Sequence, residues 1–130
     1  MIIVNMPGGA VQEIEESALL WLRKAFDSEW EGATMLRLVG DRIYSIETVE
    51  ALSGKFGLAK VRLAEFSAPD ARVKLVVSAE RVRQIVASDP NIYHEKAKSV
   101  LSFGGKMLLA VRESPDEARE KLKGAKAAVS

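Results

Sequence analysis

The sequence predicts an α+β fold, mainly an antiparallel sheet built from two ββα repeats and packed against one long N-terminal helix. Three observations support this prediction. Residues 34–47 align with residues 99–112 without a gap, and each segment is two apolar runs separated by a glycine-containing turn. Each segment leads to a hydroxyl residue and an amphipathic stretch, which is typical of a capped helix. Residues 11–26 carry apolar side chains at every third or fourth position, which indicates a helix.

The composition is that of an ordinary globular protein. A chain of 130 residues is long enough for one domain with its own core, and 48% hydrophobic and 28% charged residues argue against disorder. The absence of cysteine excludes disulfides, thiolate metal ligands and cysteine nucleophiles, and it suits a reducing compartment. No stretch resembles a signal peptide or approaches the length of a membrane span. We therefore expect a cytoplasmic protein without membrane contact.

Charge is distributed unevenly along the chain, although the net charge is only +1. Residues 1–31 contain six acidic and two basic residues, a local net charge of −4. Residues 55–83 contain seven basic and three acidic residues, a local net charge of +4. Segments of opposite charge attract each other within one fold or between subunits, or they leave the basic segment free for phosphate. All three arrangements stay open at this point.

The first elements are expected in residues 1–58. A short strand over residues 1–4 is followed by a turn, and an acidic helix over residues 11–26 follows that turn. The first ββα unit covers residues 32–58, with its hairpin turn at Gly40-Asp41. Its helix is predicted over residues 48–55, since Thr48 is an N-cap residue and Gly54 and Gly57 favour a helix end.

The middle of the chain, residues 59–98, predicts strands and a loop. Residues 59–66 alternate apolar and polar side chains, and residues 73–77 form a β-branched run typical of a buried strand. Residues 78–86 fit either a helix or a strand, and we favour a turn at residues 78–80 followed by a strand. The longest loop then reaches to about residue 96.

The second ββα unit covers residues 99–124. Its Gly104-Gly105 turn lies between two strands, and Ser114-Pro115-Asp116-Glu117 is a capping box. Gly124 is expected to end this helix, which leaves residues 125–130 as a tail.

Motifs for catalysis are sparse. His94 is the only histidine, which excludes a two-histidine metal site. The neighbouring carboxylates Glu15 and Glu16 have no feature that predicts burial, as acid-base catalysis requires. We therefore predict that the protein is not an enzyme and binds neither a metal nor another cofactor. His94, Glu15 and Glu16 are expected to be dispensable.

One resemblance to a known family rests on the order of turns and apolar strands over residues 34–122. Gly40-Asp41-Arg42-Ile43-Tyr44, residues 75–82 and residues 101–111 carry this order, which resembles the LytTR DNA-binding domain and, in its second part, the FlbD-like regulatory family. Arg72-Val73-Lys74 stands where LytTR domains carry a His-Arg-Ser signature. The resemblance implies a nucleic-acid-binding regulator.

Two classes of function follow. The first is a non-enzymatic interaction or regulatory module, for which a protein partner or self-association into a homo-oligomer is favoured over nucleic acid. The alternative is a nucleic-acid-binding regulator that uses five basic residues, and its prediction depends on their convergence on one face. These residues are Arg62, Arg72, Lys74, Arg81 and Arg83. A weaker alternative is a small-ligand pocket between the long helix and the sheet.

Overall fold

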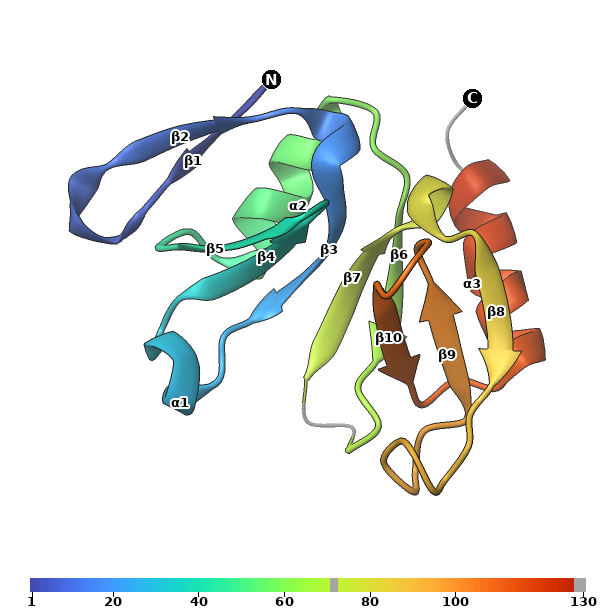
Figure 1. Cartoon of the computed structure of the whole chain (residues 1–130). Coiled ribbons are helices and arrows are strands. Elements are labelled where there is room, and N and C mark those ends of the chain that lie inside the picture. The colour runs from blue at the N-terminus through green and yellow to red at the C-terminus, as the bar shows by residue number, and fades with distance from the viewer. Residues whose placement is uncertain (71–72, 128–130) are drawn as a thin grey trace.

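Antiparallel strands dominate the computed structural model, which describes residues 1–70 and 73–127 (Figure 1). The largest sheet has the strand order β5-β4-β3-β7-β6, and a second sheet has the order β10-β9-β8. The strands β1 and β2 form a separate hairpin. The strand bounds are β1 Ile2–Asn5, β2 Val11–Ile14, β3 Leu19–Lys24, β4 Thr34–Leu38, β5 Asp41–Ser45, β6 Leu63–Ser67, β7 Lys74–Ser78, β8 Gln84–Ala87, β9 Ser99–Ser102 and β10 Leu108–Val111. The predicted α+β class with mainly antiparallel strands is therefore confirmed.

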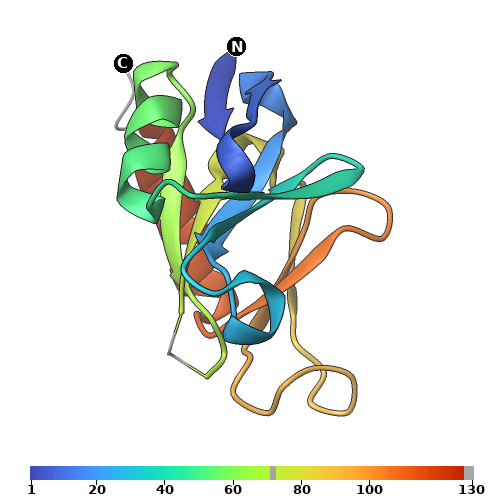
Figure 2. The same cartoon turned by 90° about the vertical axis from the view of Figure 1, so that its left-hand side faces the viewer.

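The described helices are α1 (Asp27–Trp30), α2 (Val49–Leu58) and α3 (Pro115–Ala127). Helix α2 contacts β1 and β3, and α3 contacts β6 and β8. The two helices therefore cover different groups of strands, α2 near the β1–β2 hairpin and α3 beside β8 (Figures 1 and 2). In the described part of the chain, no helix is long and apolar enough to cross a membrane.

The predicted long N-terminal helix is wrong. The segment contains β2, a 3₁₀ turn over Glu16–Ala18, and β3. Leu20 and Leu22 are both fully buried, although Leu20 belongs to one core cluster and Leu22 to the other. Strand β3 is thus central and buried on both faces, and such a strand carries a continuous apolar run. That run also satisfies a helical spacing, which explains the wrong prediction.

The chain also does not form two ββα repeats packed against a helix. The hairpins β4–β5 and β9–β10 each precede a helix, but β4 also pairs with β3, and β9 also pairs with β8. The order that recurs is longer and consists of a hairpin, a 3₁₀ turn, three antiparallel strands and a helix. It runs from β1 to α2 and again from β6 to α3. We call residues 1–61 the first half and residues 62–127 the second half.

Two core clusters lie under corresponding elements of this order, and the second cluster also contains residues of the first half, including Leu20, Trp21 and Met35. The core of the first half contains Val4 from β1, Leu22 from β3 and Phe56 from α2. The core of the second half contains Phe66 from β6 and Leu122 from α3, with Ile85 from β8 packed against it. Each helix thus closes its own half over the inner side of its strands.

The two halves are joined through β3 and β7. These strands pair antiparallel, with Trp21 opposite Val77 and Leu22 opposite Val76. The ring of Trp21 also lies 5.2 Å from the ring of Phe103, centroid to centroid. Because Val76 packs into the core of the first half, β7 contributes to both cores.

The ends of α2 and α3 differ from the predicted ones. Helix α2 continues through Gly54 and Gly57 to Leu58, and α3 continues through Gly124 to Ala127. The glycines inside these helices have no positive φ, and the residue that adopts the left-handed conformation after α2 is Lys60, with φ 68°. These three glycines are therefore part of the helices and do not end them. Residues 128–130 of the predicted tail lie outside the described residues.

Other predicted elements are confirmed. The favoured turn and strand in residues 78–86 correspond to a 3₁₀ turn over Ala79–Arg81 and to β8. The glycine turns at residues 40 and 104–105 lie between paired strands, and all three glycines have positive φ. Thr48 caps α2, since its Oγ1 accepts from the Ala51 N–H at 3.1 Å.

Candidate functional site

Two carboxylates, one in each half, fasten a helix to the first strand of that half. Glu47 accepts from the Asn5 N–H at 3.0 Å and pairs with Lys55 at 2.6 Å. Burial acts to raise the pKa of Glu47, but the hydrogen bonds from Lys55 and Asn5 hold that pKa below its usual value. Glu47 is half-buried, and its contacts fasten α2 to β1.

The second half repeats this arrangement. Glu113 accepts from the Ser67 N–H at 3.0 Å and lies 4.0 Å from the ammonium of Lys121. The neighbouring backbone groups also correspond, because Ile46 N–H donates to Asn5 O and Arg112 N–H donates to Ser67 O. We call Glu47 and Glu113, with their partners, the two carboxylate clamps. Each carboxylate is thus held by a backbone N–H and a lysine of its own half.

A third carboxylate, Glu29, holds the short helix α1 and the loop around it. Its side chain pairs with Arg23 at 2.7 Å and accepts from the Tyr44 hydroxyl at 3.0 Å. The Phe26 N–H also donates to it at 3.0 Å. The hydrogen bond from Arg23 is the largest influence and lowers the pKa of Glu29 to about 2. A carboxylate that stays ionised in this way is a structural anchor and a poor proton donor.

The five basic residues of the predicted nucleic-acid site do not form one cluster among the described residues. Arg62 and Arg81 line the same hollow. This hollow includes Ser78 at the end of β7, whereas Lys74 lies at the start of that strand. The side chain of Arg83 lies over Gly104 in the β9–β10 turn. Arg72 lies outside the described residues.

Two of these basic side chains are also occupied by acids of the same chain. Arg62 pairs with Glu80 at 3.2 Å, and Lys74 pairs with Glu65 at 3.7 Å. These partly exposed pairs contribute little to stability, but they lower the positive charge available to phosphate.

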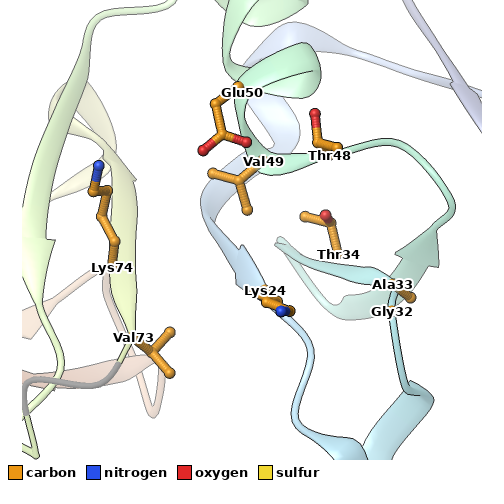
Figure 3. Close-up of a pocket in the computed structure, with 9 residues that line it drawn as sticks. All are labelled: Lys24, Gly32, Ala33, Thr34, Thr48, Val49, Glu50, Val73 and Lys74. Atoms are coloured by element: carbon orange, nitrogen blue, oxygen red, sulfur yellow. The ribbon is translucent and has the colours of Figure 1, made fainter.

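A cleft of about 530 Å³ lies between β7 and the start of α2 (Figure 3). Lys74 lines one wall, and Glu50 lines the opposite wall (Figure 3). The hydroxyl of Thr34 donates to Glu47 O at 2.7 Å, and the hydroxyl of Thr48 caps α2. Both hydroxyls are therefore used by the fold. The cleft is also not the predicted pocket against a long N-terminal helix, because that helix does not exist.

His94 and the pair of acids near the N-terminus have separate surroundings. The Nδ1 atom of His94 accepts from the Lys96 N–H at 3.1 Å, within its own loop. Glu15 and Glu16 lie between β2 and β3, at and just before a 3₁₀ turn. The described residues contain no group of three acidic, histidine or cysteine side chains able to hold a metal ion.

The surface with the clearest capacity for binding is the free edge of β8. This strand pairs with β9 on one side only, and it lies at the end of its sheet. Ser88 N–H donates to Lys98 O, and antiparallel hydrogen bonds alternate along a strand. The N–H and C=O groups of Ile85 and Ala87 therefore point away from β9.

A groove of about 440 Å³ runs beside this edge. Its wall on α3 consists of Arg119, Leu122 and Lys123, and Ile85 lies on the strand side. An extended segment that pairs with β8 would place its side chains against an apolar residue flanked by two cations. The sequence carries little signal of this edge, since three of the four residues of β8, namely Ile85, Val86 and Ala87, are apolar.

Comparison with known proteins gives no further assignment. No family model matches the chain, and no match was found among curated proteins or solved structures.

Proposed function

We propose that this chain is a non-enzymatic protein-interaction module that binds an extended strand of a partner at the edge of β8. The single observation that carries the proposal is the combination of an unpaired strand edge with an adjacent groove that is apolar at its base and cationic at its rim. Addition of a strand to a sheet edge supplies affinity through backbone hydrogen bonds, and the adjacent pocket supplies specificity through side chains.

The local charge favours an acidic partner strand. Arg119 and Lys123 lie one helical turn apart on α3 and both line the groove. Arg119 is also paired with Asp116 at 2.7 Å, in an exposed position. Such an exposed pair is weak, so an incoming carboxylate competes for Arg119 at small cost.

The proposal is tested by site-specific photocrosslinking in the native cells. A photoreactive benzoylphenylalanine is placed at Val86, whose side chain is 39% exposed on β8, or at Leu58, which is 89% exposed at the end of α2. We expect a protein crosslink from position 86 that disappears when Ala87→Pro is added, since proline removes one outward N–H of the edge. Position 58 serves as the control.

Two results would overturn the proposal. The first is an absence of crosslinks at position 86, and the second is a crosslink that persists unchanged in the Ala87→Pro variant. Ala87→Ser, which keeps the N–H, is the matched control for the proline and is expected to crosslink like the unmodified chain.

A further inference from the structure

The recurring order of elements leaves one strand pairing unmade. Strands β3 and β8 hold the same place in the two halves, and so do β7 and β2. Strand β3 pairs with β7 inside the chain, but β8 and β2 lie in separate sheets. The β1–β2 hairpin and β8 lie at opposite sides of the molecule (Figure 1). A pairing between β2 and β8 therefore requires two copies of the chain.

We propose that β8 binds the β2 strand of a second copy of this chain, in the register that β3 and β7 use within one chain. This inference rests on the proposed function, because it names the partner of the β8 edge. The β3–β7 pair places Leu22 opposite Val76 and Trp21 opposite Val77. At the corresponding positions, Ile85 of one copy lies opposite Glu13 of the other, and Gln84 lies opposite Ile14.

The backbone groups fit this register. In the β1–β2 hairpin, Met6 N–H donates to Ala10 O, and the alternation of the ladder directs the N–H and C=O groups of Val11 and Glu13 away from β1. The outward groups of β8 belong to Ile85 and Ala87, as shown above. The outward residues thus face each other as Glu13 with Ile85 and Val11 with Ala87. Both pairs are hydrogen-bonded pairs in an antiparallel ladder.

The side chains fit as well. Val76 packs in the same core cluster as Leu22 of β3 and Phe56 of α2. Its counterpart Glu13 is exposed on β2, and in the pair of copies it faces the groove with Arg119 and Lys123. A carboxylate therefore meets two cations where the internal interface has an apolar contact.

This arrangement also assigns a role to the uneven charge of the sequence. The strand that is donated carries Glu13, and Glu15 and Glu16 follow it directly. The receiving strand follows Arg81 and Arg83 and lies beside the cationic wall of α3. Complementary charge of this kind accelerates association and fixes orientation. Because the two surfaces differ, the contact is heterologous and closes into a ring or extends into a chain of copies.

Cysteine crosslinking tests the register, since the chain has no cysteine of its own. Glu13→Cys and Ile85→Cys are prepared as separate variants and mixed under oxidising conditions. In an antiparallel hydrogen-bonded pair the Cα atoms lie about 5.5 Å apart, which is within the range of a disulfide. We expect a disulfide-linked heterodimer from this mixture and from the mixture of Val11→Cys with Ala87→Cys.

The control for register is the diagonal mixture of Val11→Cys with Ile85→Cys. Diagonal neighbours lie about 7–8 Å apart, so this mixture is expected to crosslink weakly or not at all. Equal crosslinking of the diagonal and the direct mixtures would overturn the proposed register. An absence of crosslinks in all three mixtures would overturn self-association through these strands.

Charge reversal tests the chemistry of the contact by analytical ultracentrifugation at several chain concentrations. We expect the unmodified chain to associate, and Glu13→Lys to weaken this association by roughly tenfold. The second change Lys123→Glu is expected to restore it. Weakening without restoration would overturn the assigned contact between Glu13 and the groove.

The outcomes separate this inference from the proposed function. A monomer at every concentration, together with an Ala87→Pro-sensitive crosslink from position 86 to another protein, would overturn the second copy as partner and leave the β8 interaction edge standing. A monomer without any such crosslink would overturn both.

Discussion

Strands β3 and β8 hold the same place in the two halves but differ in burial and in the number of strands that pair with them. The four residues Leu19–Leu22 of β3 are all buried, and the strand has a partner on each edge. Strand β8 is largely exposed and has one partner. The difference shows that the molecule satisfies one edge internally and keeps the other available. A strand that stays at an edge must tolerate water, which explains the glutamine and alanine at its ends.

The helices differ less than the strands. Both follow a hydroxyl cap, and both are fastened by a carboxylate clamp. The helix cap and the carboxylate clamp are therefore features that each half needs for its own stability. The free edge of β8 is a feature of the second half alone. The predictions below test that separation, from the largest expected effect to the smallest.

The largest effect is expected from the helix residue at the centre of each core. Phe56 is fully buried and Leu122 is 7% exposed. Phe56→Ala is expected to lower the free energy of unfolding by about 3–5 kcal/mol, and Leu122→Ala by about 2–4 kcal/mol, because each creates a cavity. Equilibrium denaturation measures both. A larger loss for Leu122→Ala than for Phe56→Ala would contradict this order, which follows from the larger volume and fuller burial of Phe56.

The carboxylate clamps should give an intermediate effect of equal sign in both halves. Glu47→Gln and Glu113→Gln are each expected to cost about 1–2 kcal/mol, because an ionised acceptor of a backbone N–H is replaced by a neutral one. The double variant should show the sum of the two losses within about 0.5 kcal/mol, since the sites share no partner. The exposed Glu31→Gln is the control. Strong non-additivity in denaturation would indicate that the halves unfold as coupled units through the clamps.

Acid titration should reveal how much the ionised Glu29 contributes to the stability of the loop around α1. The folded-state pKa of Glu29 is about 2 against an ordinary value of 4.5, so the ionised form favours the folded state. Its contribution to stability is complete above pH 4.5 and is lost as the pH falls toward 2. Glu29→Gln should remove this part of the pH dependence of the melting temperature. An unchanged slope between pH 4.5 and 2 in that variant would contradict the assignment.

The smallest effect is expected on nucleic acid. Arg62 and Lys74 are paired within the chain, and Arg83 lies apart from the hollow that Arg62 and Arg81 share. We therefore expect no binding of duplex DNA at low ionic strength, and no change with Arg81→Glu. An anisotropy titration checks this. Micromolar binding that is lost in Arg81→Glu would favour the regulator that the LytTR resemblance implies.

The local signals of the sequence predicted local structure well. Positive-φ glycines placed both hairpin turns, and Thr48 and Ser114 marked the starts of both helices. These features depend on hydrogen bonds and dihedral angles of neighbouring residues, which the sequence displays directly.

The sequence failed where the answer depended on tertiary contacts. A run such as Leu19–Leu22 fits a helix or a buried strand equally, and only the pairing of β3 with β4 and β7 decides between them. The predicted ββα repeats were wrong, because β4 also pairs with β3 and β9 also pairs with β8, and the sequence does not display these pairings. The free edge of β8 was not predicted, because the residues of a strand do not show which other strands pair with it.

The position of β7, which follows the whole first half in the sequence, affects how the chain folds during synthesis. Every strand and the helix of the first half precede β7, so the nascent chain can close its first core before Val76 and Val77 have been made. During that interval β3 presents an unpaired edge far more apolar than that of β8. A fragment of residues 1–61 is accordingly expected to aggregate through β3 in light-scattering measurements, whereas the whole chain shields that edge. The second half thus protects the first from its own newly made strand.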